Sequence, residues 1–263
     1  MTAVGIQYIG HSTVLLEALG LRILTDPFLR DRLGPLRRHG PVPTPATIGA
    51  VAVVAISHAH PDHFDARSLK ALLGDPLVIV PRGLGRLARR AGLRAREVVV
   101  GEQVAIAPGW SITAVPARHW RWPSAPAAAA IGYLIEGPRG AGGAGDAGPA
   151  PIGIYFAGDT SRFAGLRELA GLVDLALLPV GTWGPHMSPG HLSPRSAAEV
   201  ARDIGARFAV PIHWGTLYPA EAHRLLAGRL TQPATRFVDW SRLLAPELVV
   251  HALLPGEATT ILL

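Results

Sequence analysis

The sequence predicts an α/β fold, and three observations support this class. The middle of the chain alternates between apolar runs of strand length and segments with a helical pattern. Several apolar runs stop at Gly, Pro, Asp or His, as buried strands do at their ends. Of the 263 residues, 49% are hydrophobic and 17% charged, which argues against a disordered chain. We expect a single domain over residues 1–263.

The first 25 residues predict an antiparallel sheet. Strands are expected over Gly5–Ile9, Val14–Leu19 and Leu21–Thr25, with Gly-His-Ser-Thr between the first two and Asp-Pro after the third. The default interpretations are a core histidine at His11 and an Asx turn at Asp26. Both residues stand at strand ends, so a place beside a functional site stays open for each.

The segment Arg30–Pro45 is rich in Pro and Gly and has no periodicity, which predicts a loop. We expect its arginines and His39 at the surface. Long ordered loops often carry function, so a lid over a site is an alternative.

The strongest motif lies in Ala52–Asp65, AVVAISHAHPDHFD, where an apolar run stops at three imidazoles and a carboxylate. Residues two apart project to the same side of an extended chain, so His58 and His60 can bind one ion. The intervening proline excludes a helix, and Asp62 and His63 can face a second ion beside the first. Solvated loop histidines are the alternative, but a chance H-x-H-x-D-H is expected on the order of once per thousand such chains. The motif therefore predicts a metal site.

Alternating elements continue to the next histidine. Asp65 can cap a helix that ends near Leu73, and a second helix presents four apolar residues on one face before Gly92. The four apolar residues of the second helix are Leu84, Leu87, Ala88 and Ala91. The strands expected around the two helices are Val78–Val80, Val98–Val100, Val104–Ile106 and Ser111–Val115.

Polar residues follow the next two buried strands. His119 comes after Ser111–Val115, and this position favours a site over packing; Trp120 and Trp122 would line a pocket or pack in the core. Strands over Ile131–Ile135 and Ile152–Phe156 flank a Gly/Ala/Pro-rich hairpin loop. The second of them leads to Gly-Asp-Thr, where glycine allows the carboxylate of Asp159 to approach two ions closely.

The last hundred residues repeat the pattern. Ser193 as N-cap and Pro194 at the first helical position begin a helix that ends at Gly205. The strand Phe208–Ile212 then delivers His213. Before them, the loop GTWGPHMSPGH contains Trp183, His186 and His191. The remaining expected elements are helices over Phe163–Ala170 and Pro219–Ala227, and strands over Asp174–Leu178, Leu248–Val250 and Thr259–Leu262.

The motifs H-A-H-P-D-H, R-H-W, A-G-D-T, L-L-P-V-G, G-H-L-S-P and P-I-H-W-G-T, in this order, resemble the lactonase and phospholipase D branch of the metallo-β-lactamase superfamily. The resemblance covers nearly the whole chain. It implies a four-layered αβ/βα sandwich, in which two mixed sheets lie face to face with helices on the outer faces.

The resemblance also implies the ligands of two divalent ions. One ion would be held by His58, His60 and His119, the other by Asp62, His63 and His213, with Asp159 bridging. Imidazole and carboxylate suit Zn, with Mn and Fe as alternatives. Asp62 and His191 are expected to take part in catalysis, His191 as a donor of a proton or hydrogen bond. The residues expected beside the ligands or in the substrate pocket are His11, Asp26, Trp120, Trp183 and His186.

The expected activity is hydrolysis of a phosphodiester, lactone or ester by a hydroxide held between the ions. No glycine fingerprint for a dinucleotide is present. A metal-dependent nuclease and a metal-stabilised binding protein without turnover are the alternatives. We expect a small-molecule substrate, and a homo-oligomer is compatible with the sequence.

Composition narrows the partners and the ligand types. The net charge of +6 comes almost wholly from arginine, since Lys70 is the only lysine, and no basic block of five or six appears. Arginine-rich composition with abundant Ala, Gly and Pro suggests a high-GC bacterial genome rather than a nucleic-acid binder. Cysteine is absent, so thiolate ligands and disulfides are excluded. We find no signal-peptide pattern or membrane-length apolar run and expect a cytoplasmic protein.

Overall fold

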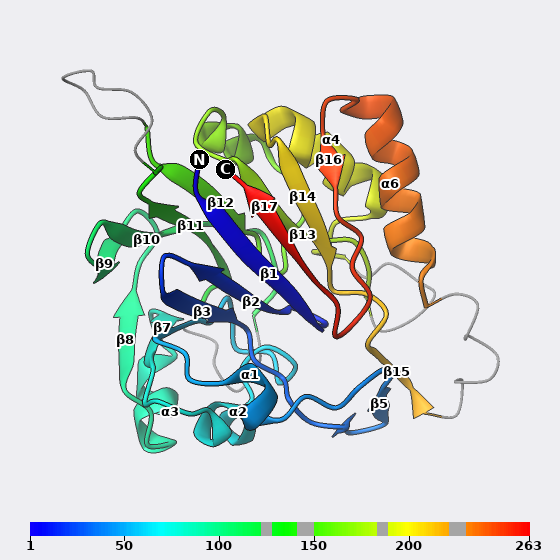
Figure 1. Ribbon diagram of the computed structural model, residues 1–263. Coiled ribbons are helices and arrows are strands. Elements are labelled where there is room, and N and C mark those ends of the chain that lie inside the picture. The colour runs from blue at the N-terminus through cyan, green and yellow to red at the C-terminus, as the bar shows by residue number, and fades with distance from the viewer. Residues whose placement is uncertain (122–127, 141–149, 183–188, 221–229) are drawn as a thin grey trace.

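A computed structural model describes the chain over residues 1–121, 128–140, 150–182, 189–220 and 230–263. Two large mixed sheets are stacked, with helices on their outer sides, which is the predicted sandwich (Figure 1). Hydrogen bonds also connect the two sheets; for example, the Tyr133 hydroxyl of the second sheet donates to the carbonyl of Ile56, directly after strand β6 of the first sheet, over 2.8 Å.

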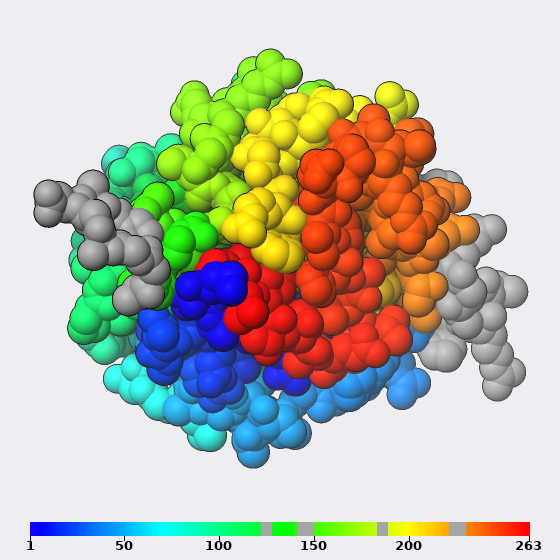
Figure 2. All heavy atoms as spheres, turned by 45° about the horizontal axis from the view of Figure 1, so that its top comes forward, coloured from blue at the N-terminus to red at the C-terminus, as the bar shows by residue number. Residues whose placement is uncertain are grey.

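The first sheet has seven strands, antiparallel at one side and parallel at the other. The first and last strands of the chain pair here, as the adjacent blue and red atoms in Figure 2 show. In spatial order the strands are β17 (Ala258–Leu262), β1 (Ala3–Gly10), β2 (Thr13–Ala18), β3 (Leu21–Thr25), β6 (Val53–Ala55), β7 (Leu77–Pro81) and β8 (Ala95–Val98).

The second sheet repeats this plan, with three antiparallel pairings followed by three parallel ones. In spatial order its strands are β9 (Gln103–Ala107), β10 (Trp110–Pro116), β11 (Ile131–Gly137), β12 (Ile152–Phe156), β13 (Leu175–Pro179), β14 (Phe208–Ile212) and β16 (Val249–Val250).

Helices cover the outer faces of both sheets. Ser193 caps α4 in a reciprocal pair with Ser196, Pro194 occupies its first turn, and Gly205 ends it in the left-handed conformation, as predicted. No described helix is long and apolar enough to cross a membrane. The helices are α1 (Pro45–Ile48), α2 (Ala66–Ala71), α3 (Gly85–Arg90), the 3₁₀ helix η1 (Ala164–Leu169), α4 (Pro194–Ile204) and α6 (Gln232–Leu244).

Alternating side chains build the core between the sheets. In β1, Val4, Ile6 and Tyr8 are buried, while Ala3 and the residues between them are more exposed. The short strand β6 is buried throughout, as expected for a central strand covered on both faces. The first sheet packs its other face on a second apolar cluster under α2 and α3.

The prediction of a loop over Arg30–Pro45 is wrong in part. The segment contains two short strands, β4 (Arg32–Leu33) and β5 (Leu36–Arg38), which form a three-stranded sheet with β15 (Leu217–Pro219). Strand β15 occupies the start of the helix expected from Pro219, and residues 221–229 lie outside the described part of the chain.

Two residues expected at the surface of this loop are buried. The guanidinium of Arg38 donates to the carbonyls of Ile9, Phe28 and Arg30, so its hydrogen bonds are made inside the protein. Burial lowers the pKa of Arg38 to about 10. The backbone amide of His39 donates to the Thr216 carbonyl over 2.7 Å, which draws this residue inward.

Candidate metal centre

The ends of four strands bring the candidate ligands to one edge of the sandwich. The motif His58–His63 follows β6 of the first sheet, whereas His119, Asp159 and His213 follow β10, β12 and β14 of the second. All of them except His119, which is half-buried as a residue, are buried. The centre therefore lies where the carboxyl ends of strands from both sheets meet.

A glycine permits the two sheets to approach each other at this edge. Gly158, just before Asp159, has a φ of +56°, and a Cβ there would lie 2.4 Å from the Cβ of Ser57. Any other residue would be strained and would push the end of β12 away from the end of β6. The glycine expected to allow close approach therefore sits where two strand ends converge.

The first group of candidate ligands is His58, His60, His119 and Asp159. Their ligand atoms lie within 4.8 Å of one another. His60 Nδ1 is 2.9 Å from His58 Nε2 and 3.1 Å from His119 Nε2, and Asp159 Oδ2 is 3.8 Å and 4.0 Å from the same two nitrogens. Ligand atoms of a tetrahedral ion with Zn–N bonds of about 2.0–2.1 Å lie about 3.3 Å apart. This group could hold one ion.

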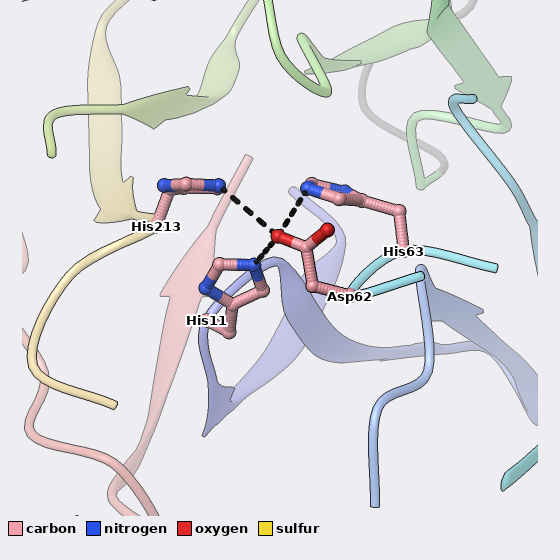
Figure 3. A group of neighbouring side chains, drawn as sticks. All are labelled: His11, Asp62, His63 and His213. Atoms are coloured by element: carbon pink, nitrogen blue, oxygen red, sulfur yellow. Dashed lines mark hydrogen bonds and ion pairs between the residues drawn. The ribbon is translucent and has the colours of Figure 1, made fainter. Parts of the chain in front are cut away.

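The second group lies beside the first and is drawn in Figure 3. His63 Nε2 and His213 Nε2 point toward Asp62 Oδ2 at 3.3 Å and 3.9 Å. The same two nitrogens lie 3.2 Å and 3.3 Å from Asp159 Oδ2. One oxygen of Asp159 is thus within 4.0 Å of nitrogens from both groups, as a bridging carboxylate would be.

His11 contacts this second group from the turn between β1 and β2. Its Nε2 lies 2.7 Å from Asp62 Oδ2, and burial lowers the pKa of His11 to about 3, so the ring is neutral and donates Nε2–H to the carboxylate. The backbone is fixed as well, because the His213 amide donates to the His11 carbonyl over 2.7 Å. His11 therefore orients Asp62 and ties its turn to the loop after β14.

Four of the histidines are oriented by the nitrogen that faces away from the centre. In each of them Nδ1 contacts an acceptor, which leaves the Nε2 lone pair for an ion. His60 has the opposite orientation, with Nδ1 toward the centre. The acceptors are Ser57 Oγ for His58 (2.9 Å), Asp26 Oδ2 for His63 (2.7 Å), the Gly190 carbonyl for His119 (2.9 Å) and the Gly181 carbonyl for His213 (2.9 Å).

Asp26 connects the two groups from behind. Its carboxylate accepts from the Ser57 amide (2.7 Å), the Ser57 hydroxyl (2.5 Å) and His63 Nδ1 (2.7 Å). Because the Ser57 hydroxyl donates to Asp26, it can accept from His58. Asp26 lies where a residue beside the ligands was expected. The role of Ser57, which links Asp26 to His58, was not predicted. A hydroxyl residue directly before the first histidine of the motif could have indicated it.

The protonation states of the centre suit cation binding. Burial lowers the pKa of His58 well below its usual value, that of His60 to about 4, and that of His119. Burial disfavours the ionised forms of Asp62 and Asp159, but neighbouring histidines outweigh it and hold both pKa values well below the usual range. Neutral imidazoles and ionised carboxylates are the forms that bind metal ions.

The pKa of His63 indicates that a positive charge is favoured at the centre. Burial lowers this pKa, but the carboxylates of Asp159, Asp62 and Asp26 outweigh burial and raise the pKa well above the usual value. The Nε2 atoms of His63 and His213 and the Oδ1 of Asp159 are buried without a hydrogen-bond partner among the described residues. Buried polar atoms of this kind are usually satisfied by a bound ion or water, so the donor set fits a divalent metal.

Two of the remaining predicted site residues, His191 and Trp120, are described and lie beside the first group. His191 Nε2 is 3.2 Å from Asp159 Oδ2, and its ring is 4.7 Å from that of His119. Trp120 is half-exposed, with its ring 4.4 Å from that of His60, and it lines a cavity of about 450 Å³ together with Arg118, Arg121 and the backbone around Gly190. Trp183 and His186 lie outside the described residues.

Comparison with known proteins agrees with this geometry. The sequence profile of the β-lactamase superfamily domain matches residues 21–214. An uncharacterised protein of Mycobacterium tuberculosis is 32% identical over 271 residues, covering 96% of this chain and 67% of the relative. The N-acyl-phosphatidylethanolamine-hydrolyzing phospholipase D 1 of Caenorhabditis elegans is 31% identical over 243 residues, covering 81% of this chain and 64% of the relative. This alignment thus includes less than two thirds of the worm enzyme.

Among solved structures, a metallo hydrolase from Ignicoccus hospitalis superposes with a TM-score of 0.72 at 21% identity, covering 98% of each chain. This likeness shows a shared fold, with both sheets included. The profile match covers most of the chain and points to the same family. The chain belongs to the metallo-β-lactamase superfamily and is a metal-dependent hydrolase of that superfamily.

Proposed function

We propose that this chain is a dinuclear hydrolase of phosphodiesters or of lactones and esters. The observation that carries the proposal is the position of Asp159 Oδ2, within 4.0 Å of imidazole nitrogens from both candidate groups. Two ions held there, most simply Zn, would lower the pKa of a water and stabilise negative charge on the attacked group. The relationship to a phospholipase D supports the phosphodiester in particular.

The protein residues have distinct parts in this proposal. His58, His60 and His119 would hold one ion and Asp62, His63 and His213 the other, and Asp159 would contribute to both. Asp62 keeps its orientation through the hydrogen bond from His11, and Asp26 keeps the tautomers of His58 and His63. Trp120 supplies an aromatic wall next to the first group.

A turnover panel tests the substrate class. The metal-loaded protein is assayed side by side on a phosphodiester, a lactone, a carboxyl ester and a β-lactam. We expect the phosphodiester or the lactone to have the highest kcat/KM. Preference for the β-lactam would contradict the proposed class, and absence of turnover on all four with two ions bound would favour a binding protein.

His191 is proposed as the donor to the leaving oxygen. It lies on the loop before α4, and its Nε2 is 3.2 Å from Asp159 Oδ2. It is not among the residues proposed to hold either ion. An imidazole with a reference pKa of about 6.5 can protonate an alkoxide near neutral pH, whereas a nitrophenolate departs as a stable anion without such help.

The His191→Gln variant is expected to lose about a hundred-fold or more in kcat on an alkyl ester of the preferred substrate. On the nitrophenyl ester of the same acid its kcat should change little. Metal content is measured in parallel, and His251→Gln, at a histidine beside Phe208 and away from the centre, is the matched control. An equal loss on both esters would mean that His191 only positions the substrate, and no loss on either would remove it from the site.

A further inference from the structure

The positive charge of this protein is concentrated on one outer face. The segment Ala66–Val100 holds eight cations and two carboxylates, so its net charge equals the +6 of the whole chain. Seven of these cations are exposed and form no ion pair with any other residue in the described ranges. They are Arg67, Lys70, Arg82, Arg86, Arg89, Arg90 and Arg94.

Most other exposed arginines in the described ranges lie within ion-pair distance of a carboxylate. Arg195, Arg202 and Arg242, on α4 and α6, lie 2.9–3.5 Å from Glu199, Asp203 and Asp239. The two carboxylates of the basic segment do not act in this way. Glu97 accepts hydrogen bonds from the backbone amides of Gly83 and Gly85, and Asp75 makes no ion pair among the described residues. The excess charge is therefore a property of this face.

The cations share one face because of the chain topology. Helix α2 connects β6 to β7 and α3 connects β7 to β8, and these neighbouring strands are parallel. Successive right-handed crossovers place both helices on the same side of the sheet, where Figure 1 shows them next to each other. We name this surface, made of α2, α3 and the turns at Arg82 and Arg94, the basic face.

Apolar side chains are interspersed with the charges. Leu73, two residues after α2, is 46% exposed, and Leu87 within α3 is 45% exposed. Val99 and Val100, directly after β8, are exposed as well. Exposed leucines between unpaired arginines are typical of surfaces that meet a lipid headgroup layer, where cations attract phosphates and apolar groups enter the interface. The whole segment Ala66–Val100 contains no aromatic residue, His, Asn or Gln, which are the side chains other than Arg and Lys that commonly stack on or read nucleic-acid bases.

We propose that the basic face docks this protein on membranes containing anionic phospholipid. The charge complementarity is with lipid phosphate and the apolar complementarity with the acyl boundary. Because α2 directly follows the motif His58–His63, docking would hold the candidate centre next to the bilayer surface. The proposal is independent of the substrate class.

Vesicle flotation tests the proposal with the full chain. We expect the protein to float with phosphatidylcholine vesicles that contain phosphatidylglycerol, not with phosphatidylcholine alone, and to be released by salt. The triple variant Arg86→Gln, Arg89→Gln, Arg90→Gln should bind about a hundred-fold less, since each cation near an anionic surface contributes about 1 kcal/mol. The matched control Arg195→Gln, Arg202→Gln, Arg242→Gln removes the same charge elsewhere and should bind as the unchanged protein does.

A second variant separates a bilayer from other polyanions. Leu87→Asn should weaken vesicle binding and leave binding to heparin unchanged. Unchanged melting temperatures verify that the variants fold. Failure to float with phosphatidylglycerol vesicles would overturn the proposal, as would an equal loss in both triple variants. If Leu87→Asn leaves vesicle binding unchanged, and if the protein binds single-stranded DNA or polyglutamate more tightly than it binds the vesicles, the basic face has a different partner.

Discussion

Removal of the two proposed metal ions is expected to stop turnover and to lower the melting temperature by about 10–20 °C. Each ion bound at a hundred times its Kd stabilises the folded protein by about 2.7 kcal/mol, and each kcal/mol corresponds to about 2–4 °C in a chain of this length. Without cations, the buried carboxylates of Asp62, Asp159 and Asp26 lie around His63 and raise its pKa well above the usual value.

The measurement combines calorimetry before and after chelation with elemental analysis, which should give two ions per chain. Addition of Zn should restore both the melting temperature and the activity. Full activity with one ion, or with none, would contradict the two-ion proposal.

Asp159→Asn is expected to lower kcat/KM by about a thousand-fold or more and to reduce the metal content. The carboxamide is similar in shape but lacks the charge that would join two cations, and loss of several kcal/mol of charge stabilisation corresponds to this factor. Asp239→Asn, on the exposed surface of α6, is the control and should behave as the unchanged protein. Retention of both ions with a rate within about tenfold would refute the bridging position.

Much of the fold could be predicted because it depends on local patterns. The strands Leu21–Thr25, Ile152–Phe156 and Phe208–Ile212 have the predicted bounds, since each is a short apolar run between clear breakers. The cap of α4 at Ser193 was predicted from the same kind of signal. The helix expected over Phe163–Ala170 is the 3₁₀ helix η1 (Ala164–Leu169), and apolar spacing alone does not distinguish the two helix types.

The errors arise where distant segments pair. Strand β5 pairs with the distant segment Leu217–Pro219, and no local periodicity indicates such a partner. Strand β4 then pairs with β5 across the turn at Gly34 and Pro35. The buried Arg38 has the same origin, because its acceptors come from other segments. Helix α6 was missed although a signal was present, with Pro233 in its first turn and Ala234 and Phe237 spaced to face the core.

The sequence predicted which side chains lie together in the candidate centre, but not how each ring is oriented. The spacing of the motif Ala52–Asp65 predicted that His58 and His60 share one side, and the structure brings their ring nitrogens to 2.9 Å. Chain position could not predict which nitrogen of each ring faces inward. That orientation depends on acceptors such as the Gly181 and Gly190 carbonyls, which only the folded chain brings into place.

The contact between His11 and the loop after β14 has a consequence for folding order. The His11 amide donates to Thr216 Oγ1, 205 positions away, and His213 donates back to the His11 carbonyl. Closing such a separation is slow and must wait until β14 has been synthesised. The motif Ala52–Asp65 therefore emerges from the ribosome long before its partners and, on the proposed ligand set, would offer only part of a coordination sphere. We expect the nascent chain to capture its full set of ions last, as the step that completes folding.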